Sequence, residues 1–358
     1  MGATGTMNDA WLTLREVRAG DRVAVLSPSW AAPAHYPQVH EQAMDRLRER
    51  LGLEPVEFPT TRRTTTPRER AADVNAAFAD PSIRAILSTI GGDDQITMTP
   101  YLDARPVRAD PKPFLGFSDN TNLLSWLAYH RVPAVHGGST QISIGPGPAP
   151  HPLHLDSLRL ALSGGDHVLE VPTQISEVGH RWDHPRALTD RPESYPAEPW
   201  SWAGPSRAVT GRLWGGCLEI LSWVLAVGRF VRPVEEYQGG VLLLETSEEL
   251  PSPHEVYRML RLLGERGLLA AFDALVWGRP IVDDERMVPD PVVASRARAA
   301  YREQVLRAVA EYHEDMVVVQ DVDCGHTLPQ HLLPFGEQIT VDGVNQRVTA
   351  HFRRAPRP

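Results

Sequence analysis

The chain has 358 residues, enough for about two domains of ordinary size with a substantial buried core. Its hydrophobic fraction of 42% and charged fraction of 23% exclude a disordered chain, a collagen-like fibre and a small disulfide scaffold. The 45 acidic residues outnumber the 36 basic ones, and the formal charge of −9 argues against a nucleic acid polymer as the main partner.

The N-terminal residues and the cysteines indicate the compartment. Residues 1–6 are small and polar, so we expect no signal peptide, and no apolar stretch is long enough to span a membrane. The two cysteines, Cys217 and Cys324, fit a reducing compartment and exclude a cysteine-based zinc site. Two buried thiols are favoured, although the sequence leaves a single bridge possible. We therefore expect a cytoplasmic protein without membrane contact.

The first 165 residues alternate strand and helix patterns. Such alternation predicts a parallel sheet with helices on both faces. Strands are expected over 22–26, 56–58, 83–90 and 113–117. Helices are expected over 39–51, where Gly52 provides a stop, over 68–80, from 123 to 127, and over 154–163.

Residues 166–206 have a different composition. The stretch 172–205 holds six prolines together with Trp182, Trp200 and Trp202, whereas flexible linkers are poor in aromatic residues. We expect this segment to pack against the rest of the molecule, with Trp200 and Trp202, which lie next to the resuming strand, against the core.

The alternation resumes after residue 206. Strands are expected over 209–214, 240–246, 274–278 and 316–320, and helices from Gly215-Gly216 to 227, after 253 and over 295–312. Ser252 to Glu255 forms a capping box with proline at the first helical position. The predicted fold is α/β with an N-terminal domain (1–165), a connecting segment rich in Pro and Trp (166–206) and a smaller C-terminal domain (207–358).

A nucleophile candidate lies where a buried strand passes into a helix. In Gly116-Phe117-Ser118-Asp119, the hydroxyl of Ser118 sits on a tight turn, and the N–H of Asp119 at the helix start can stabilise an oxyanion. Gly91 and Gly92 follow another strand, where backbone N–H groups can approach a ligand. The carboxyl ends of parallel strands are where ligands bind. The alternative is that Ser118 only caps its helix.

A base and its carboxylate are available in the second half. Glu245 ends a continuous apolar strand, where a carboxylate needs a partner, and His326 follows the strand over 316–320. A serine hydroxyl requires a base, and that base requires a carboxylate to fix its tautomer. We predict a triad of Ser118, Glu245 and His326 between the two domains. Cys324 as nucleophile is disfavoured.

These motifs resemble the serine-peptidase family of the LD-carboxypeptidases and the microcin C self-immunity proteins. The resemblance extends over nearly the whole chain and is carried by segments 20–29, 91–92, 116–121, 211–217, 245–248, 325–327 and 334–336. It implies the same Ser–Glu–His triad, an oxyanion hole from the N–H groups of Gly92 and Asp119, and an N-terminal domain similar to class I glutamine amidotransferases. It also implies a cytoplasmic homodimer with neither cofactor nor metal.

Two branches of that family have different substrates. LD-carboxypeptidases remove the terminal D-alanine from cell-wall tetrapeptides. The immunity branch cleaves the amide between a C-terminal aspartyl group and a modified nucleotide, and it carries a longer connecting segment with a tryptophan that stacks on the nucleobase. Trp182 resembles that tryptophan, so the immunity branch is favoured, with a peptidyl- or aminoacyl-nucleotide as substrate.

Two alternatives remain. One is muropeptide LD-carboxypeptidase activity. The other is a non-catalytic protein that binds small molecules, in which Glu245 and His326 form an ordinary buried pair.

Overall fold

The computed structural model describes residues 10–357 and is a mixed α/β structure around one 14-stranded sheet. The prediction about a signal peptide in residues 1–6 lies outside the described residues. The main path of the sheet runs in the order β10-β14-β13-β12-β11-β15-β6-β5-β4-β2-β3. The predicted fold class, α/β with a mostly parallel sheet, is confirmed.

The N-terminal half contributes five parallel strands. These are β2 (Arg22–Leu26), β3 (Glu54–Glu57), β4 (Ile83–Ser88), β5 (Phe114–Gly116) and β6 (Ala134–His136). The helices of this half are α1 (Pro37–Leu51), α2 (Pro67–Ala79), α3 (Ala104–Ala109), α4 (Thr121–Tyr129) and α5 (Pro152–Ser163). Gly52 ends α1 with a left-handed φ of 66°, as its position in the sequence predicts.

The C-terminal half contributes four parallel strands and an antiparallel edge strand. They are β11 (Ala208–Cys217), β12 (Gly240–Glu245), β13 (Phe272–Gly278), β14 (Val317–Val322) and the edge strand β10 (Ser201–Ala203). Its helices are α7 (Leu218–Val227), α8 (Pro253–Glu265), α9 (Leu268–Ala271) and α10 (Pro291–Tyr312). The capping box of Ser252 and Glu255 is formed. Gly215 and Gly216 extend β11 instead of opening α7, because pairing with β12 continues to Cys217.

The two halves are joined through strands that the sequence pattern did not reveal. β15 (Leu333–Phe335) pairs with β6 of the first half and with β11 of the second. β16 (Gln338–Asp342), β17 (Arg347–Phe352) and β7 (Gly165–Val168) continue from β11 as an antiparallel branch. β1 (Leu14–Arg15) pairs with β18 (Arg354–Ala355). The sheet is thus continuous through both halves, and domain boundaries at 165 and 206 stay a prediction.

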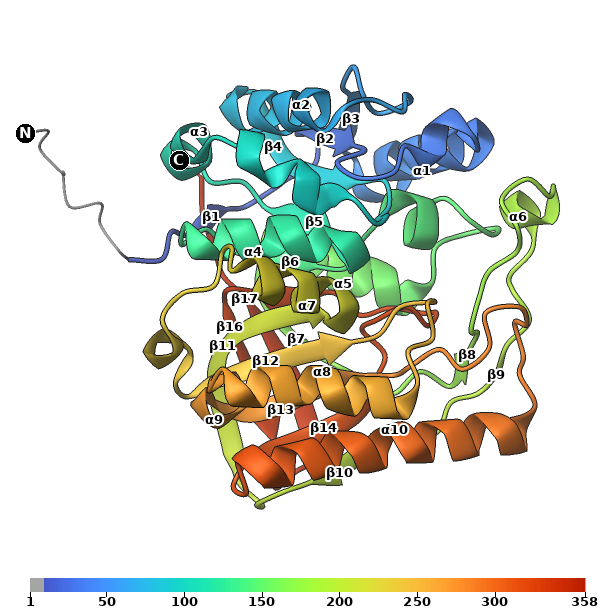
Figure 1. Ribbon diagram of the computed structural model, residues 1–358. Coiled ribbons are helices and arrows are strands. Elements are labelled where there is room, and N and C mark those ends of the chain that lie inside the picture. Colours follow the sequence, from blue (N-terminus) through green and yellow to red (C-terminus); the bar gives the residue numbers. More distant parts are fainter. Residues whose placement is uncertain (1–9, 358) are drawn as a thin grey trace, which may run out of the picture.

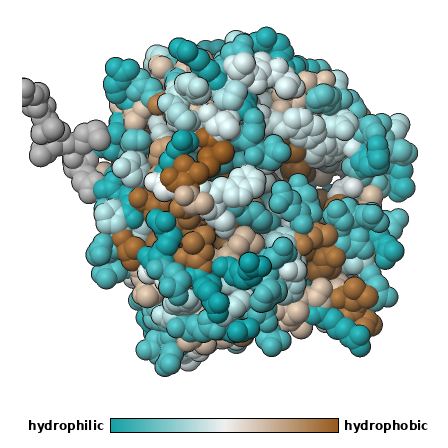
Figure 2. All heavy atoms as spheres, in the orientation of Figure 1, coloured by the Kyte–Doolittle hydropathy of each residue, from teal (hydrophilic) through white to brown (hydrophobic). Residues whose placement is uncertain are grey.

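Helices cover both faces of the sheet, and each face has its own core. Alternate side chains of β2 point to opposite sides, with Ala24 and Leu26 in one cluster and Val23 and Val25 in the other. Figure 1 shows α4, α7, α8 and α10 as one layer in front of the sheet. Helices α1 and α5 pack in the second cluster. On the face shown in Figure 2, apolar patches lie among mostly polar side chains. Among residues 10–357, no helix is both long and apolar enough to cross a membrane.

The connecting segment packs against both halves, as predicted from its tryptophans. It contains the two-stranded sheet of β8 (Gln174–Ile175) and β9 (Tyr195–Pro196), and the short helix α6 (Arg186–Thr189). Figure 1 shows these elements along one side of the molecule. Trp200 is buried and donates from Nε1 to Asp323 at 2.9 Å, and Trp202 packs against the second core. Short 3₁₀ and π turns complete the fold: η1 (Ala32–Ala34), η2 (Gln95–Thr97), η3 (Thr99–Tyr101), η4 (Ser118–Asn120), η5 (Thr140–Ile144) and η6 (Val234–Tyr237).

Candidate active site

Ser118 lies on a strained turn between β5 and α4. Its φ is 62°, in the left-handed region that non-glycine residues seldom adopt, and the turn η4 begins at this residue. Such strain at a strand-to-helix turn is the arrangement that exposes a nucleophilic serine. Gly116 permits the sharp turn, since a Cβ there would lie 2.9 Å from the side chain of Asn120. Ser118 itself is half-buried, so its hydroxyl is within reach of a ligand.

Gly91 packs directly against this turn, and Gly92 packs against Ser29 and Trp30. A Cβ on Gly91 would lie 2.9 Å from Oγ of Ser118 and 3.2 Å from the backbone nitrogen of Asp119. A Cβ on Gly92 would lie only 2.2 Å from Oγ of Ser29. Neither position has room for a side chain. The structure brings Gly91, Ser118 and Asp119 together, and Gly92 lies beside Ser29, whose hydroxyl donates to the carboxylate of Asp119.

The side chain of Asp119 is fully engaged inside the protein. Its Oδ2 accepts hydrogen bonds from the hydroxyl of Ser29 and, at 2.9 Å, from the backbone N–H of Gln95. Its Oδ1 accepts from Asn122 at 2.9 Å. Burial raises the pKa of this carboxyl, while the hydrogen bonds from Ser29 and Gln95 act in the opposite direction. The carboxylate is thus a structural anchor, and the backbone N–H is the group that Asp119 can offer to a ligand.

Glu245 and His326 meet at the end of β12. Oε2 of Glu245 lies 2.6 Å from Nδ1 of His326, and Glu245 is completely buried. Gly325 makes this approach possible, because a Cβ there would lie 2.7 Å from the same carboxylate oxygen. The imidazole also packs edge-on against the ring of Phe117, with ring centroids 4.9 Å apart. Since Phe117 precedes Ser118, the pair lies beside the nucleophile turn.

The charge state of His326 is set by opposing effects. Burial lowers the pKa of the imidazole, but Glu245 and the neighbouring carboxylates Glu248 and Glu219 outweigh it and raise the pKa to about 9. Oε2 of Glu248 lies 3.4 Å from Nε2 of His326, the ring nitrogen opposite Glu245. Each ring nitrogen therefore faces a carboxylate, which stabilises the protonated imidazole.

Glu219 and Glu248 are site residues that the sequence analysis did not identify. Glu219 is buried at the start of α7, and burial raises the pKa of its carboxyl. Its Oε1 accepts the backbone N–H and the hydroxyl of Ser247, both at 2.8 Å. A signal for Glu248 was the run of acids that follows the strand ending at Glu245, within the segment 245–248 that carries the family resemblance. Glu219 is outside that run.

Trp182 packs against other aromatic side chains. Its indole stacks on Trp30 with ring centroids 6.3 Å apart and meets Tyr36 edge-on at 5.5 Å. Trp30 also stacks on His35, at 5.8 Å. We call Trp30, His35, Tyr36 and Trp182 the aromatic cluster. Because the backbone N–H of Trp30 donates to the carbonyl of Gly91 at 3.1 Å, the aromatic cluster is connected to the turn that borders Ser118. Trp30 was not predicted, although it follows a strand as Gly91 does.

The two cysteines are free and buried. Burial raises the pKa of the Cys324 thiol well above its usual range, which disfavours a thiolate nucleophile. The carbonyl of Cys324 lies 3.1 Å from Nε2 of His136, so that histidine is held by the protein interior. Within residues 10–357, no group of three or more His, Cys, Asp or Glu side chains could hold a metal ion.

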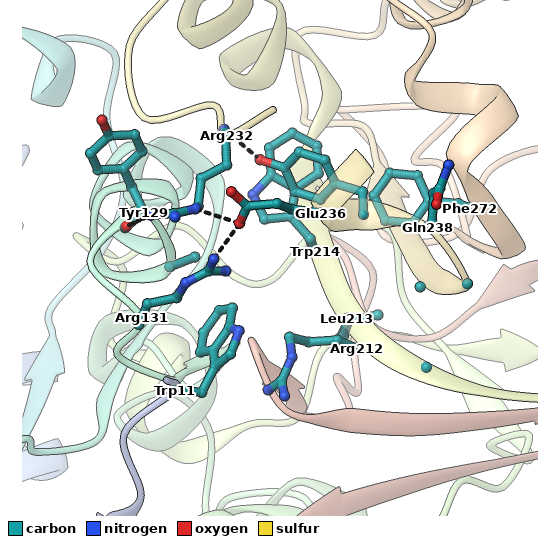
Figure 3. Close-up of a pocket in the computed structure, with 15 residues that line it drawn as sticks. Trp11, Tyr129, Arg131, Arg212, Leu213, Trp214, Arg232, Glu236, Gln238 and Phe272 are labelled. Atoms are coloured by element: carbon teal, nitrogen blue, oxygen red, sulfur yellow. Dashed lines mark hydrogen bonds and ion pairs between the residues drawn. The ribbon is translucent and has the colours of Figure 1, made fainter. Parts of the chain in front are cut away.

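A separate pocket of about 260 Å³ lies beside the middle of β11, at Gly211 to Trp214, and at the amino end of β12 (Figure 3). The guanidinium groups of Arg212 and Arg131 face the ring of Trp11, at 4.4 and 5.6 Å from its centroid. Glu236 forms ion pairs with Arg131 and with Arg232, the latter at 2.6 Å. None of the predicted site residues lines this pocket.

Comparison with known proteins identifies the family. The model for the LD-carboxypeptidase N-terminal domain matches residues 23–137, and the model for the C-terminal domain matches residues 210–341. The chain belongs to the LD-carboxypeptidase family. It is therefore a serine peptidase, and the resemblance seen in the sequence is confirmed.

The relatives of this chain are named for different activities. A carboxypeptidase homologue of Vibrio cholerae is 26% identical over 92% of this chain and 95% of its own length. The microcin C7 self-immunity protein MccF of Escherichia coli is 27% identical over 80% of this chain and 79% of its own length. The murein tetrapeptide carboxypeptidase of Pseudomonas aeruginosa is 28% identical over 78% of each chain.

Solved structures show the same fold. A MccF-like protein from Streptococcus pneumoniae in complex with AMP superposes with a TM-score of 0.80 at 25% identity, covering 92% of this chain and 98% of its own. MccF in complex with aspartyl sulfamoyl adenosine gives a TM-score of 0.78 at 24% identity, over 95% and 98% of the two chains.

Proposed function

We propose that this serine peptidase hydrolyses the amide bond between the C-terminal residue of an aminoacyl or short peptidyl group and a modified nucleotide, and so detoxifies microcin C-like conjugates. The observation that carries the proposal is the pair of Glu245 and His326 packed against Phe117, directly beside the strained turn of Ser118. The family resemblance implies an aspartyl or other acidic residue on the acyl side.

In the proposed mechanism, Oγ of Ser118 attacks the scissile carbonyl carbon while Nε2 of His326 takes its proton. Glu245 holds the opposite nitrogen, Nδ1, and stabilises the imidazolium that forms. The N–H groups of Gly92 and Asp119 stabilise the negative oxygen of the tetrahedral intermediate. The C–N bond then breaks, and His326 donates its proton to the departing amine. Water hydrolyses the acyl ester with His326 again as base, which restores Ser118.

The aromatic cluster supports a nucleoside as the leaving group. Trp30 is 38% exposed and Trp182 is half-buried, so aromatic surface is available close to the glycine pair. Base stacking on an aromatic ring contributes about 1–3 kcal/mol without requiring specific hydrogen bonds. Related proteins of this fold are described in complex with AMP and with aspartyl sulfamoyl adenosine. A cell-wall tetrapeptide offers no ring to stack.

The proposal is tested by incubating the protein with an aminoacyl-sulfamoyl adenosine and with a murein tetrapeptide, side by side. We expect release of the sulfamoyl nucleoside by the wild type and a loss of about 1000-fold or more in kcat for Ser118→Ala, with an unchanged melting temperature. Trp182→Leu should raise KM for the nucleotide substrate by about 5- to 100-fold and leave kcat nearly unchanged.

Two results would contradict it. Cleavage of the tetrapeptide alone identifies muropeptide carboxypeptidase activity, the function named for the Pseudomonas relative. Unchanged turnover by Ser118→Ala removes Ser118 from the mechanism.

We also propose, from the family resemblance, a cytoplasmic homodimer. Exposed apolar side chains on the helical layer provide a candidate contact, among them Tyr129 on α4 and Trp223 and Val227 on α7. Sedimentation equilibrium at micromolar concentration should give twice the chain mass, and a single-chain mass contradicts the proposal.

A further inference from the structure

The nucleophile and the base of the proposed triad come from different halves of the molecule. Ser118 follows β5, whereas His326 lies on the loop 323–332 between β14 and β15. Within residues 10–357, Nε2 of His326 forms no hydrogen bond, either to Ser118 or to another group. The distance between the two reacting groups is therefore set by the contacts that hold the loop 323–332 against the N-terminal half.

His136 makes the first of these contacts. It is the last residue of β6, the strand next to β5, and it pairs with Gly116. Its side chain is completely buried, and its Nε2 lies 3.1 Å from the carbonyl oxygen of Cys324. Because a carbonyl only accepts, His136 donates from Nε2, and burial lowers its pKa and keeps the ring neutral. The strand beside the nucleophile thus holds the loop two residues before His326.

The ring of His136 also packs in the same group as the base. Phe117, the residue before Ser118, meets the imidazole of His136 edge-on, with ring centroids 6.1 Å apart. The same phenyl ring meets the imidazole of His326 at 4.9 Å. Since buried side chains are closely packed, a shift of one of these three rings displaces the next.

Gln330 makes a second connection of the same kind. Its Nε2 donates to the carbonyl of Gly325 at 2.9 Å, and its Oε1 accepts the N–H of Gly138 at 3.2 Å. Gln330 is buried, and Gly138 lies just beyond the end of β6. Both peptide carbonyls that precede His326 are therefore bound by side chains that are connected to the end of this strand.

We infer that His136 is a positioning residue of the reaction, which holds His326 at the distance from Ser118 that proton transfer requires, with Gln330 as a second support of the same loop. This inference rests on the triad of the proposed function and is independent of the leaving group. Proton transfer needs heavy atoms about 2.6–3.2 Å apart, and a misplacement of about 1 Å can cost roughly 100-fold in rate. The contribution of His136 is its N–H donor, which a phenyl ring lacks.

The experiment separates the donor from the ring. His136→Phe keeps a ring beside Phe117 and removes the donor, so kcat for the aminoacyl-sulfamoyl adenosine should fall by about 10- to 100-fold with KM within about twofold of the wild type. His136→Gln returns an N–H donor and should bring kcat back to within about fivefold of the wild type. His40→Phe is the matched control and should keep wild-type kcat, because His40 is also completely buried but pairs with Glu57 on the edge strand β3.

Labelling with a fluorophosphonate probe tests the same geometry without a nucleotide. The rate of labelling at Ser118, expressed per folded molecule, should fall by about 10- to 100-fold in His136→Phe and stay unchanged in His40→Phe. If His136→Phe does not fold, Gln330→Met, which removes both hydrogen bonds of the second connection, takes its place with the same expected loss of kcat at constant KM.

The outcomes distinguish this inference from the proposed function. Wild-type labelling and kcat in His136→Phe, or a loss that His136→Gln does not recover, overturn the inference and leave the proposed function standing. If labelling follows the inference but the aminoacyl-sulfamoyl adenosine is not cleaved, the proposed substrate is wrong and the positioning role stands. If the wild type is not labelled at Ser118, both are wrong.

Discussion

The two ends of β11 and β12 carry opposite charges. At their carboxyl ends, Cys217 pairs with Glu245, and the acids Glu219 and Glu248 lie nearby. Among the described residues, the ion-pair partner of Glu245 and Glu248 is His326, and no arginine or lysine pairs with these acids. Beside the middle of β11 and the amino end of β12, the pocket of Figure 3 contains three arginines and the single acid Glu236.

The difference lies in how these charges are satisfied. The arginines of the amino-end pocket are used in packing: Arg131 and Arg232 share Glu236, and Arg212 lies over Trp11 and donates to the carbonyl of Gly336. At the carboxyl ends, one oxygen of Glu245 and Nε2 of His326 are buried without a hydrogen-bond partner among the described residues. Buried polar groups normally have partners, and at these two atoms a bound substrate can provide one. The candidate catalytic groups lie at the carboxyl ends of the parallel strands, where ligands bind in α/β folds, and not in the pocket of Figure 3.

The largest effect should come from Glu245→Gln. The amide keeps the shape of the side chain but removes the charge that fixes His326, so kcat should fall by about 10,000-fold, as in other triads that lose their carboxylate. Steady-state kinetics with the aminoacyl-sulfamoyl adenosine measures this, with the melting temperature as the control for folding. If kcat falls by less than tenfold, Glu245 is an ordinary buried partner of His326 and not part of a catalytic triad.

A smaller effect is expected from Gly91→Ala. The added Cβ would lie 2.9 Å from Oγ of Ser118, and a displacement of the nucleophile by about 1 Å can cost roughly 100-fold in rate. Gly179→Ala is the matched control, because its Cβ would meet only one atom, 4.0 Å away. If both variants keep wild-type kcat, the glycine pair does not border the reacting groups.

The pH profile should reflect the carboxylates around His326. A base must be neutral to accept a proton, and the pKa of His326 is raised to about 9, so kcat/KM should fall as the pH drops below about 9. The groups facing the imidazole are Glu245 at the end of β12, Glu248 on the following loop and Glu219 at the start of α7.

Glu248→Gln removes one of the charges that stabilise the imidazolium, so the acidic limb should move to lower pH. If the acidic limb of the pH profile does not shift in this variant, Glu248 does not raise the pKa of His326.

The smallest effect is expected in the pocket of Figure 3, away from the carboxyl ends of the strands. Arg212→Gln removes a guanidinium from the amino-end pocket, far along β11 from Cys217, and should leave kcat/KM within about twofold of the wild type because surface substitutions away from a site have small effects. The same kinetic assay checks this. A loss comparable to that of Gly91→Ala would mean that the two ends of the strands act together.

Sequence patterns predicted the parts of the fold that depend on local chemistry. The end of α1 at Gly52 and the start of α8 at Ser252 depend on backbone conformation and capping within a few residues, and both were placed correctly. Strand β15 was missed because three residues with a central proline give no periodic signal, and its pairing with β6 is a long-range contact. The candidate triad followed from polar residues at strand ends.

The charge of the site was not predictable in the same way. Glu219 and Glu248 lie in different elements, and only the pairing of β11 with β12 and the bond between Ser247 and Glu219 bring them to His326. Trp30 likewise joins Trp182 across 152 residues of sequence. Residues at strand ends can be predicted from the local sequence pattern. The residues that change their charge state come close only through the pairing of distant strands.

The central claim is that Ser118 is the nucleophile activated by His326 and Glu245. Labelling the native protein with a fluorophosphonate probe, followed by peptide mass spectrometry, tests it directly. The account predicts one adduct on Ser118 that is lost in Ser118→Ala and strongly slowed in His326→Ala. An unlabelled native protein, or an adduct on another residue with Ser118 unmodified, would contradict it.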